Sequence, residues 1–332
     1  MLLLVSKNYM FKSSSFKPAW WLSNPHFQTM AAKFLRRNEK VVTCREIVQL
    51  PDNDSLELAW TELPKGQENK PIIILLHGLE GSVDSHYAKG MLKTLKAHGW
   101  IGVLMHFRGC GQYPNKLGRS YHSGDIEDIS YLVSLIERRY PLNKKAIIGF
   151  SLGGNVLANY LAKTANTTIK AGVMICAPFD LISCSKCINK GVSKIYQKYL
   201  IDMLKTNAQI KIERQQVEHI SLKQLQKIKT LWDFDNQYTA PLNGFVDALD
   251  YYHQASGKQL LAKINTPCLI IHAQDDPFLC HRSTVESLNI NTNIHFEVSK
   301  KGGHVGFITG NNPLNPHYWL EQRVPAYLAR YL

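Results

Sequence analysis

Short runs of apolar residues recur along the chain, and amphipathic segments separate them. The run at residues 71–76 reads Pro-Ile-Ile-Ile-Leu-Leu and contains no polar residue. Runs of this length, rich in β-branched residues, are typical of strands that are buried on both faces of a parallel sheet. The same pattern predicts further strands at residues 100–107, 146–150, 170–176, 267–272 and 293–298.

Helical periodicity fills several of the intervals between these runs. Residues 87–98 have a helical pattern, and a second helix is expected to open near residue 124, with its apolar positions at Ile129, Leu132, Val133 and Ile136. Residues 44–50 and 56–62 alternate as strands around a Pro-Asp-Asn-Asp turn, which predicts a hairpin. The chain is therefore expected to form an α/β fold, with a mostly parallel eight-stranded sheet and helices on both faces.

Two segments fall outside this alternation. Residues 184–256 contain no strand-like run and are rich in Lys, Gln, Tyr and Leu, which indicates a helical insertion that forms a cap. Residues 1–43 are expected to form an N-terminal arm over the main domain, residues 44–332, with Trp20, Trp21 and Phe27 as buried anchors.

Composition and charge narrow the class of protein. The chain has 332 residues, of which 45% are hydrophobic, enough for a sizeable core. Its formal charge is +13, which favours encounters with anionic surfaces. The basic residues are scattered, in short groups such as Arg36-Arg37 and Lys144-Lys145, and such groups are more typical of solvated faces. We expect no nucleic-acid partner and at most peripheral membrane contact.

Cysteine usage and the chain's start suggest an intracellular protein. The seven cysteines form an odd, dispersed set, so we expect reduced thiols and interpret the C-x-x-C spacing of Cys184 and Cys187 as coincidence. The apolar start, Met1 to Val5, is broken by Lys7 and is too short for a signal segment. No run of 18 apolar residues occurs. These features predict a soluble, cytoplasmic protein.

The candidate nucleophile lies at residues 149–153, Gly-Phe-Ser-Leu-Gly, between a predicted strand and a predicted helix. A sharp strand-to-helix turn of this kind exposes Ser151 above the sheet edge, and glycines at positions 149 and 153 avoid collisions with neighbouring backbone. The motif alone is also compatible with a glycine-rich turn that carries an idle serine. Its position between strand and helix favours the nucleophile.

An acyl-transfer enzyme needs two N–H donors for the oxyanion. The residue after the nucleophile, Leu152, supplies one, and the loop after an early strand supplies the other. That loop begins with His77-Gly78, so Leu79 is the expected second donor. We interpret His77 as a structural support of the loop.

The acid and the base are expected after later strands. Asp276 follows the strand at residues 267–272, and we choose it over Asp275 as the acid. His304 follows the final strand in a glycine-rich loop, where it can act as the general base. Asp125 and Asp128 precede the serine in the chain, and we attribute them to helix capping.

Several stretches together resemble the YheT-type family of the α/β-hydrolase superfamily. The resemblance runs from about Pro18 to the C-terminus. It is carried by Asn24-Pro25-His26-Phe27-Gln28-Thr29, His77-Gly78-Leu79-Glu80-Gly81-Ser82, Arg108-Gly109-Cys110-Gly111, Tyr121-His122-Ser123-Gly124-Asp125, Gly149-Phe150-Ser151-Leu152-Gly153-Gly154-Asn155, Asp275-Asp276-Pro277-Phe278 and Gly302-Gly303-His304-Val305-Gly306-Phe307.

The resemblance implies a serine hydrolase that cleaves carboxylic esters, with Ser151, Asp276 and His304 as nucleophile, acid and base. A short- to medium-chain or lipid-like acyl ester is the substrate class that it suggests. The expected reaction passes through an acyl-serine and needs no metal or organic cofactor. Two alternatives remain: an acyltransferase that uses the same acyl-enzyme, and a non-catalytic binding module on the same fold.

Overall fold

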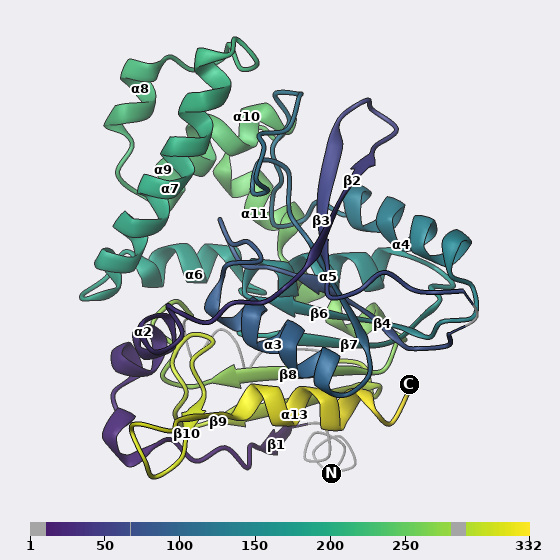
Figure 1. Ribbon diagram of the computed structural model, residues 1–332. Helices are drawn as coiled ribbons and strands as arrows, with labels where there is room; N and C mark the ends of the chain where they lie inside the picture. The colour runs from purple at the N-terminus through teal and green to yellow at the C-terminus, as the bar shows by residue number, and fades with distance from the viewer. Residues whose placement is uncertain (1–10, 67, 280–289) are drawn as a thin grey trace, which may run out of the picture.

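The computed structural model describes residues 11–66, 68–279 and 290–332. Two expectations concern residues outside these ranges. One is that Met1 to Val5 are too short for a signal segment, and the other is that Cys280, one of the seven cysteines, is reduced. Among the described residues, the main sheet has nine strands in the order β1-β9-β8-β7-β6-β4-β5-β3-β2 (Figure 1). The strands are β1 (Phe11–Ser13), β2 (Cys44–Gln49), β3 (Ser55–Trp60), β4 (Ile72–Leu76), β5 (Ile101–Met105), β6 (Lys145–Phe150), β7 (Ile169–Ile175), β8 (Cys268–Ala273) and β9 (Ile294–Ser299).

In this spatial order, all neighbouring strands from β1 through β9, β8, β7, β6 and β4 to β5 pair in parallel. The β5–β3 and β3–β2 pairs are antiparallel. The predicted hairpin is confirmed, because β2 pairs with β3 from Cys44 opposite Trp60 to Gln49 opposite Ser55. The sheet has one strand more than the eight expected. The additional strand, β1, is only three residues long and pairs with the edge strand β9, so its sequence gives no strand-length pattern.

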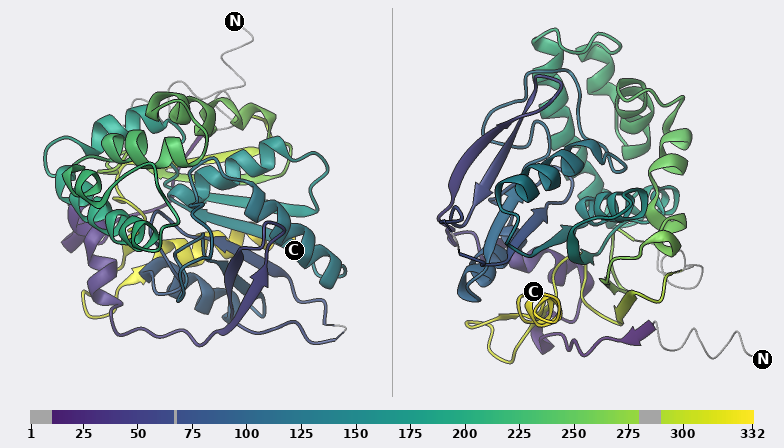
Figure 2. Two further views of the ribbon diagram at one scale, coloured as in Figure 1. Left: turned by 90° about the horizontal axis from the view of Figure 1, so that it is seen from above. Right: turned by 90° about the vertical axis from the view of Figure 1, so that its right-hand side faces the viewer.

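Helices cover both faces of the sheet, as the two further views show (Figure 2). Because side chains alternate along a strand, β4 sends Ile72, Ile74 and Leu76 to one core and Ile73 and Leu75 to the other. The first core is completed by α4 (Glu127–Arg139) and α5 (Leu152–Lys163), and the second by α3 (His86–Ala97) and α13 (Trp319–Leu328). A small separate sheet joins β10 (Ile308–Thr309) and β11 (His317–Tyr318).

The segment between β7 and β8 is helical and contains no strand. Much of it extends away from the sheet (Figure 1), and it has an apolar cluster of its own, which includes Ile201, Leu225 and Phe234. The longest helix here is α7. The helical elements of this segment are α6 (Leu181–Ile188), α7 (Ser193–Glu213), α8 (Leu222–Lys227), α9 (Leu231–Phe234), the π-helix η2 (Asp235–Thr239), α10 (Ala240–Leu242), α11 (Ala248–Ala255) and the 3₁₀ turns η3 (Gly257–Gln259) and η4 (Leu261–Lys263).

The segment before β2 contains the 3₁₀ turn η1 (Trp20–Leu22) and the helix α2 (Pro25–Leu35). Asn24 caps α2, since its side chain accepts hydrogen bonds from the N–H groups of His26 and Phe27. The expectation of buried anchors is wrong for Trp20 and Phe27, which expose 71% and 63% of their surface. Trp20 lies in η1, where Leu22 is the buried residue, and Phe27 lies on the solvent-exposed face of α2.

Two further observations concern the cysteines and the helices. Cys187 is disulfide-bonded, so the expectation of reduced thiols is wrong for this residue. The spacing between Cys184 and Cys187 did not predict this bond. Across the described residues, no helix combines the length and the apolar character that crossing a bilayer requires.

Candidate active site

Ser151 lies at the sharp turn between β6 and α5. Its backbone is in the left-handed region, with φ 51° and ψ −120°, and its N–H donates to the carbonyl of Ile175 on the neighbouring strand at 2.8 Å. Non-glycine residues rarely adopt this conformation, which here projects the side chain out of the turn.

The two glycines beside Ser151 allow this turn to pack. A Cβ on Gly149 would lie 2.4 Å from the carbonyl oxygen of Gly153, and a Cβ on Gly153 would lie 2.5 Å from that of Leu76. Both contacts are with backbone, which cannot rotate away. Glycine is therefore required at both positions, as the sequence pattern predicted.

His304 is held beside Ser151 by the loop that follows β9. Its Nε2 lies 3.0 Å from Ser151 Oγ, and its backbone N–H donates to Thr29 Oγ1 at 2.9 Å. The ring of Phe278 stacks on the imidazole with a centroid distance of 4.0 Å. Gly303 has a φ of 60°, which lets the loop turn immediately before the histidine. The imidazole is thus fixed from its backbone and from one face.

The two adjacent aspartates after β8 have different partners. Asp276 is buried; its Oδ2 lies 2.8 Å from His304 Nδ1, and its Oδ1 accepts from the N–H of Phe278. Asp275 instead accepts from the N–H of Gly303 at 3.0 Å. The structure therefore joins Ser151, His304 and Asp276 in one hydrogen-bonded chain, and Asp275 supports the histidine loop.

The expected oxyanion donors belong to residues close to Ser151. Leu152 is the first residue of α5, and a Cβ on Gly78, next to Leu79, would lie 3.2 Å from Ser151 Cβ. Within the described part of the chain, neither the N–H of Leu79 nor that of Leu152 has a hydrogen-bond partner. Two unpaired N–H groups beside a nucleophile are what an oxyanion requires.

His77 supports the loop that carries Leu79. Its Nδ1 lies 2.7 Å from the carbonyl of Gly78, and its Nε2 accepts from the N–H of Phe107 at 3.0 Å. Burial lowers the pKa of His77 to about 3, so the ring is neutral and can donate at one nitrogen and accept at the other. This agrees with the structural role expected for His77.

Glu80, which follows Leu79 directly, has contacts that the sequence did not predict. The hydroxyl of Tyr121 accepts from the N–H of Glu80 at 2.8 Å and donates to its Oε1 at 2.7 Å. Asn207 on α7 donates to the other carboxyl oxygen. Burial raises the pKa of the Glu80 carboxyl. Glu80 and Tyr121 each belong to one of the sequence motifs quoted above. Their presence in these motifs was the one sign in the sequence of a role at the site.

A cavity of about 790 Å³ extends from the hydrogen-bonded chain. Ser151 and His304 contribute to its wall on the sheet side, and the helical segment supplies much of the rest. Its apolar lining from α6, α7 and α9 includes Leu181, Ile188, Leu200, Met203, Leu204 and Phe234. A cavity of this size and lining suits an apolar ligand of substantial length.

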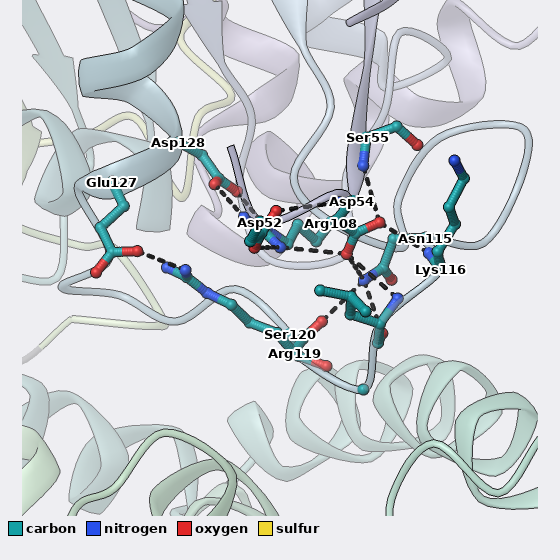
Figure 3. A network of polar contacts seen from close by, with 12 residues as sticks. Asp52, Asp54, Ser55, Arg108, Asn115, Lys116, Arg119, Ser120, Glu127 and Asp128 are labelled. Atoms are coloured by element: carbon teal, nitrogen blue, oxygen red, sulfur yellow. Dashed lines mark hydrogen bonds and ion pairs between the residues drawn. The ribbon is translucent and has the colours of Figure 1, made fainter. Parts of the chain in front are cut away.

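A second polar network lies beside this site and is built on Arg108 (Figure 3). Arg108 makes a bidentate pair with Asp128 at 2.7 and 2.8 Å and also donates to Asp52 at 2.6 Å and to Asp54 at 3.2 Å. Asn115 donates to Asp54 at 2.7 Å. The network ties the β2–β3 turn to the start of α4.

These partners correct the expectation that Asp125 and Asp128 serve helix capping. Asp128 binds Arg108 instead, because the guanidinium reaches it from the loop after β5. Asp125 does accept from the N–H of Glu127 at 3.2 Å, but it also pairs with Arg119 at 3.0 Å.

Among the described residues, one group that could hold a metal ion shares Asp276 and His304 with the hydrogen-bonded chain. Donor atoms of Cys176, Asp276 and His304 all lie within 4.8 Å of one another. Burial raises the pKa of the Cys176 thiol well above its usual range, and a neutral thiol is a poor ligand. Its sulfur accepts from the N–H of Val305 at 3.4 Å, so its observed contacts support the histidine loop.

The fold and these residues define a class of protein. The family model described as the alpha/beta hydrolase fold matches residues 71–311, and the chain belongs to that family. The expected fold class and the resemblance stated above are confirmed.

Relatives and solved structures agree with the family. YheT of Escherichia coli (strain K12), provisionally named an esterase, is 41% identical over 327 residues, covering 98% of this chain and 96% of YheT. The monoacylglycerol lipase of Saccharomyces cerevisiae is 30% identical over 246 residues, covering 72% of this chain and 55% of the lipase. The esterase Pf2001 of Pyrococcus furiosus shares the fold, with a TM-score of 0.56, 18% identity and coverage of 89% of this chain and 95% of the esterase.

Proposed function

We propose that the protein is a serine hydrolase that cleaves carboxylic esters through an acyl-serine intermediate. One observation carries the proposal: the Ser151–His304–Asp276 chain ends at a hydroxyl in the wall of an apolar cavity, between two unpaired N–H groups. The esterase and lipase names of the relatives support the same reaction class.

In the first step, His304 Nε2 accepts the proton of Ser151 as Oγ attacks the ester carbonyl. Asp276 accepts a hydrogen bond from His304 Nδ1, which fixes the tautomer and stabilises the imidazolium. The N–H groups of Leu79 and Leu152 stabilise the oxyanion. His304 then returns the proton to the alcohol as the C–O bond breaks. In the second step, a water molecule attacks the acyl carbon as His304 takes its proton. The bond between the acyl carbon and Ser151 Oγ then breaks, His304 returns the proton to Oγ, and the acid is released.

The cavity supports a lipid-like or medium-chain acyl group as substrate, since its wall from α6, α7 and α9 is largely aliphatic. In this proposal, residues 184–256 act as the cap expected from the sequence, residues 1–43 form the arm, and no metal or organic cofactor takes part. The name of the yeast relative, a monoacylglycerol lipase, supports a lipid ester. The cytoplasmic location stays a prediction.

The test measures hydrolysis of p-nitrophenyl esters from acetate to palmitate, together with labelling by a fluorophosphonate probe. Ser151→Ala is expected to lose both, and Ser185→Ala to keep both. Ser185 is a matched control because it also lines the cavity but belongs to α6. A folded wild type that neither turns over any ester nor takes the label would contradict the proposal and favour a binding module.

Added alcohol separates hydrolysis from acyl transfer. With glycerol or butanol present, a hydrolase releases mainly free acid, whereas an acyltransferase forms mainly the new ester. Labelling of Ser151 is expected in both cases, so only the products distinguish the two reactions.

A further inference from the structure

The opening of the cavity lies between α2 and the start of α7, which are far apart in sequence. Lys33 on α2 donates to the hydroxyl of Tyr199 on α7 at 3.0 Å, and His26 lies 3.0 Å from the hydroxyl of Tyr196. Lys33 and Tyr199 both line the cavity and are both solvent-exposed. A residue with both properties marks the point where a cavity opens.

Large apolar side chains are exposed on both helices at this opening. On α2, Phe27 and Phe34 expose 63% and 62% of their surface and lie seven residues apart, on one stripe of the helix. At α7, Val192, Ile195 and Tyr199 expose 53%, 69% and 50% and follow the same spacing. Exposed apolar groups clustered at one place, unlike scattered ones, indicate a site of interaction.

Basic residues accompany these apolar groups. Lysines recur every four residues across α6 and the start of α7, and no acidic residue occurs between Asp180 and Asp202. The lysines are Lys186, Lys190, Lys194 and Lys198, and all are exposed. Among the described residues, Asp202 pairs with Lys198 at 2.6 Å and Asp84, in the cavity wall, pairs with Lys89 at 3.6 Å, so these acids do not offset the charges of Lys186, Lys190 and Lys194. The surface therefore carries a net positive charge.

We propose that this surface docks on a lipid bilayer that contains anionic phospholipid. We call it the entrance rim, and it consists of Phe27, Lys33, Phe34, Lys186, Lys190, Val192, Lys194, Ile195, Lys198 and Tyr199. Its apolar side chains would enter the headgroup region, and its lysines would meet lipid phosphates. That the docked rim admits a lipid ester to Ser151 rests on the proposed function.

The placement of the rim favours a bilayer over a second copy of the chain. A protein partner seated on this surface would close the cavity, whereas a bilayer supplies apolar molecules at its opening. Long lysine side chains beside apolar ones suit an interface where the stem is buried and the ammonium group reaches the phosphates. Tyr199 is of the type enriched at membrane interfaces, and Phe is common on the apolar face of helices that lie in such an interface.

The test is flotation of the full chain with vesicles of phosphatidylcholine, either pure or mixed with phosphatidylglycerol. Binding is expected only to the mixed vesicles and is expected to fall at about 0.5 M salt, where exposed charges are largely screened. The variant Lys190→Glu/Lys194→Glu should lower the vesicle affinity by about tenfold or more. Lys223→Glu/Lys227→Glu on α8 makes the same change in net charge and should keep the affinity.

The apolar part of the rim has its own pair of variants. Phe27→Ser/Phe34→Ser should also lower the affinity by about tenfold or more, because the two exposed rings that the bilayer would bury are lost. Leu142→Ser/Val246→Ser removes side chains that are at least as exposed, at 69% and 87%, and should have little effect. Thermal unfolding of each variant verifies that it is folded.

Several outcomes would overturn the docking proposal: equal binding to pure phosphatidylcholine, losses as large in the control variants, or a sizing-column dimer that Phe27→Ser/Phe34→Ser dissociates. Hydrolysis of soluble p-nitrophenyl butyrate by the wild type is measured separately. If vesicles bind but this ester is not cleaved, docking stands and the proposed function fails. If the ester is cleaved but no vesicle binds, the reverse holds.

Discussion

The carboxyl edge of the sheet and the helical segment between β7 and β8 differ in the kind of contacts that hold them. At the edge, short loops hold each polar group by two or more contacts, and glycines stand where a Cβ would meet backbone at about 2.5 Å. In the helical segment, packing is between aliphatic and aromatic side chains, such as Ile201, Leu225 and Phe234. The edge fixes directions in space, and the helical segment encloses a volume.

Because of this difference, the two regions tolerate substitutions unequally. Proton transfer depends on atoms near 3 Å from one another, so a small shift at the edge removes catalysis. An apolar wall can change its shape with little effect on that geometry. A few polar contacts join the regions: Asn207 to Glu80, and Lys211 to Ser120 at 2.8 Å. Burial lowers the pKa of Lys211 to about 8.

The largest expected effect comes from exchanging one carboxylate at the edge. Asp276→Asn should lower kcat by about 10⁴-fold, because the amide can favour the wrong imidazole tautomer and no longer stabilises the imidazolium. Asp275→Asn is the matched control in the same loop. Its oxygen can still accept from Gly303, and a loss of at most about tenfold is expected. Steady-state kinetics with p-nitrophenyl butyrate measures both variants. A greater loss in Asp275→Asn would reverse the assignment of the two aspartates.

The second polar network at the edge tests stability instead of rate. Asp54 is fully buried and accepts from Arg108, Asn115 and two or more backbone N–H groups, among them those of Ser55 and Lys116 at 2.8 Å. Asp54→Asn should lower the free energy of unfolding by about 3 kcal/mol, because it leaves buried donors without an acceptor and removes one of the three carboxylates that pair with Arg108. Urea unfolding at pH 7 measures this loss.

The control for Asp54 is Asp84→Asn. Asp84 is 77% exposed and pairs with Lys89 at 3.6 Å, so a change within about 0.5 kcal/mol is expected. Equal losses in the two variants would mean that the Arg108 network contributes no more than an exposed ion pair.

Acid should reduce the difference between the wild type and Asp54→Asn. Burial raises the pKa of Asp54, but hydrogen bonds from Asn115 and the backbone, together with Arg108, outweigh it, and the pKa is lowered overall. A carboxylate with a lowered pKa stabilises the fold above its unfolded pKa of about 3.9 and loses that contribution as the pH falls through the folded value. Unfolding measured from pH 7 down to pH 3 checks this sign.

Much of the edge could be predicted from the sequence because its signals are local. Gly149 and Gly153 surround Ser151 within five residues, and Asp276 and His304 each follow a recognisable apolar strand. Chain order then places all three at one edge of the sheet. The sequence also favoured Asp276 over Asp275 as the acid, and the hydrogen bond between Asp276 and His304 agrees with that prediction.

Features that depend on distant partners could not be predicted in this way. Asp54 and Arg108 lie 54 residues apart, and nothing in either local sequence indicates that they meet. The Glu80–Asn207 contact spans 127 residues. Strand β1 exists only because β9 offers an unpaired edge, and the exposure of Phe27 depends on which face of α2 meets the domain. The hydrophobic pattern of a sequence therefore predicts helices and strands better than it predicts the tertiary contacts between them.

The wall of the cavity offers a smaller and more selective effect. Met203 on α7 lines the cavity, and Met203→Trp should shorten the space for an acyl chain. We expect kcat/KM for long p-nitrophenyl esters to fall about tenfold, and that for the acetate to change within about twofold. Gln209→Trp adds the same side chain at an exposed position of α7 and should alter neither. A loss that is equal for all chain lengths would mean that α7 is coupled to the edge more tightly than the comparison implies.

The smallest expected effect is a gain in stability within the helical segment. Burial raises the pKa of Asp235 to about 6, against hydrogen bonds from Tyr252 and Thr239 that lower it. Between about pH 6 and about pH 3.9, Asp235 is largely protonated in the folded state and ionised in the unfolded state. The contribution of this group to stability therefore rises as the pH falls across that interval. At pH 7 both states are ionised, and the buried charge carries its full penalty.

Asp235→Asn should therefore raise the free energy of unfolding at pH 7 by about 1 kcal/mol, because the amide removes the charge, its oxygen can accept from one of the two hydroxyl groups, and its NH2 group can donate to the other. The gain should shrink at pH 5, where the wild-type carboxyl is largely protonated. Tyr252→Phe removes the donor 2.6 Å from Asp235 Oδ2 and should lower stability at pH 7. Urea unfolding of the three proteins at both pH values measures these changes. A loss in Asp235→Asn at pH 7 would show that this carboxylate, like Asp54 at the edge, stabilises the fold, and the contrast between the two regions would then fail for buried charges.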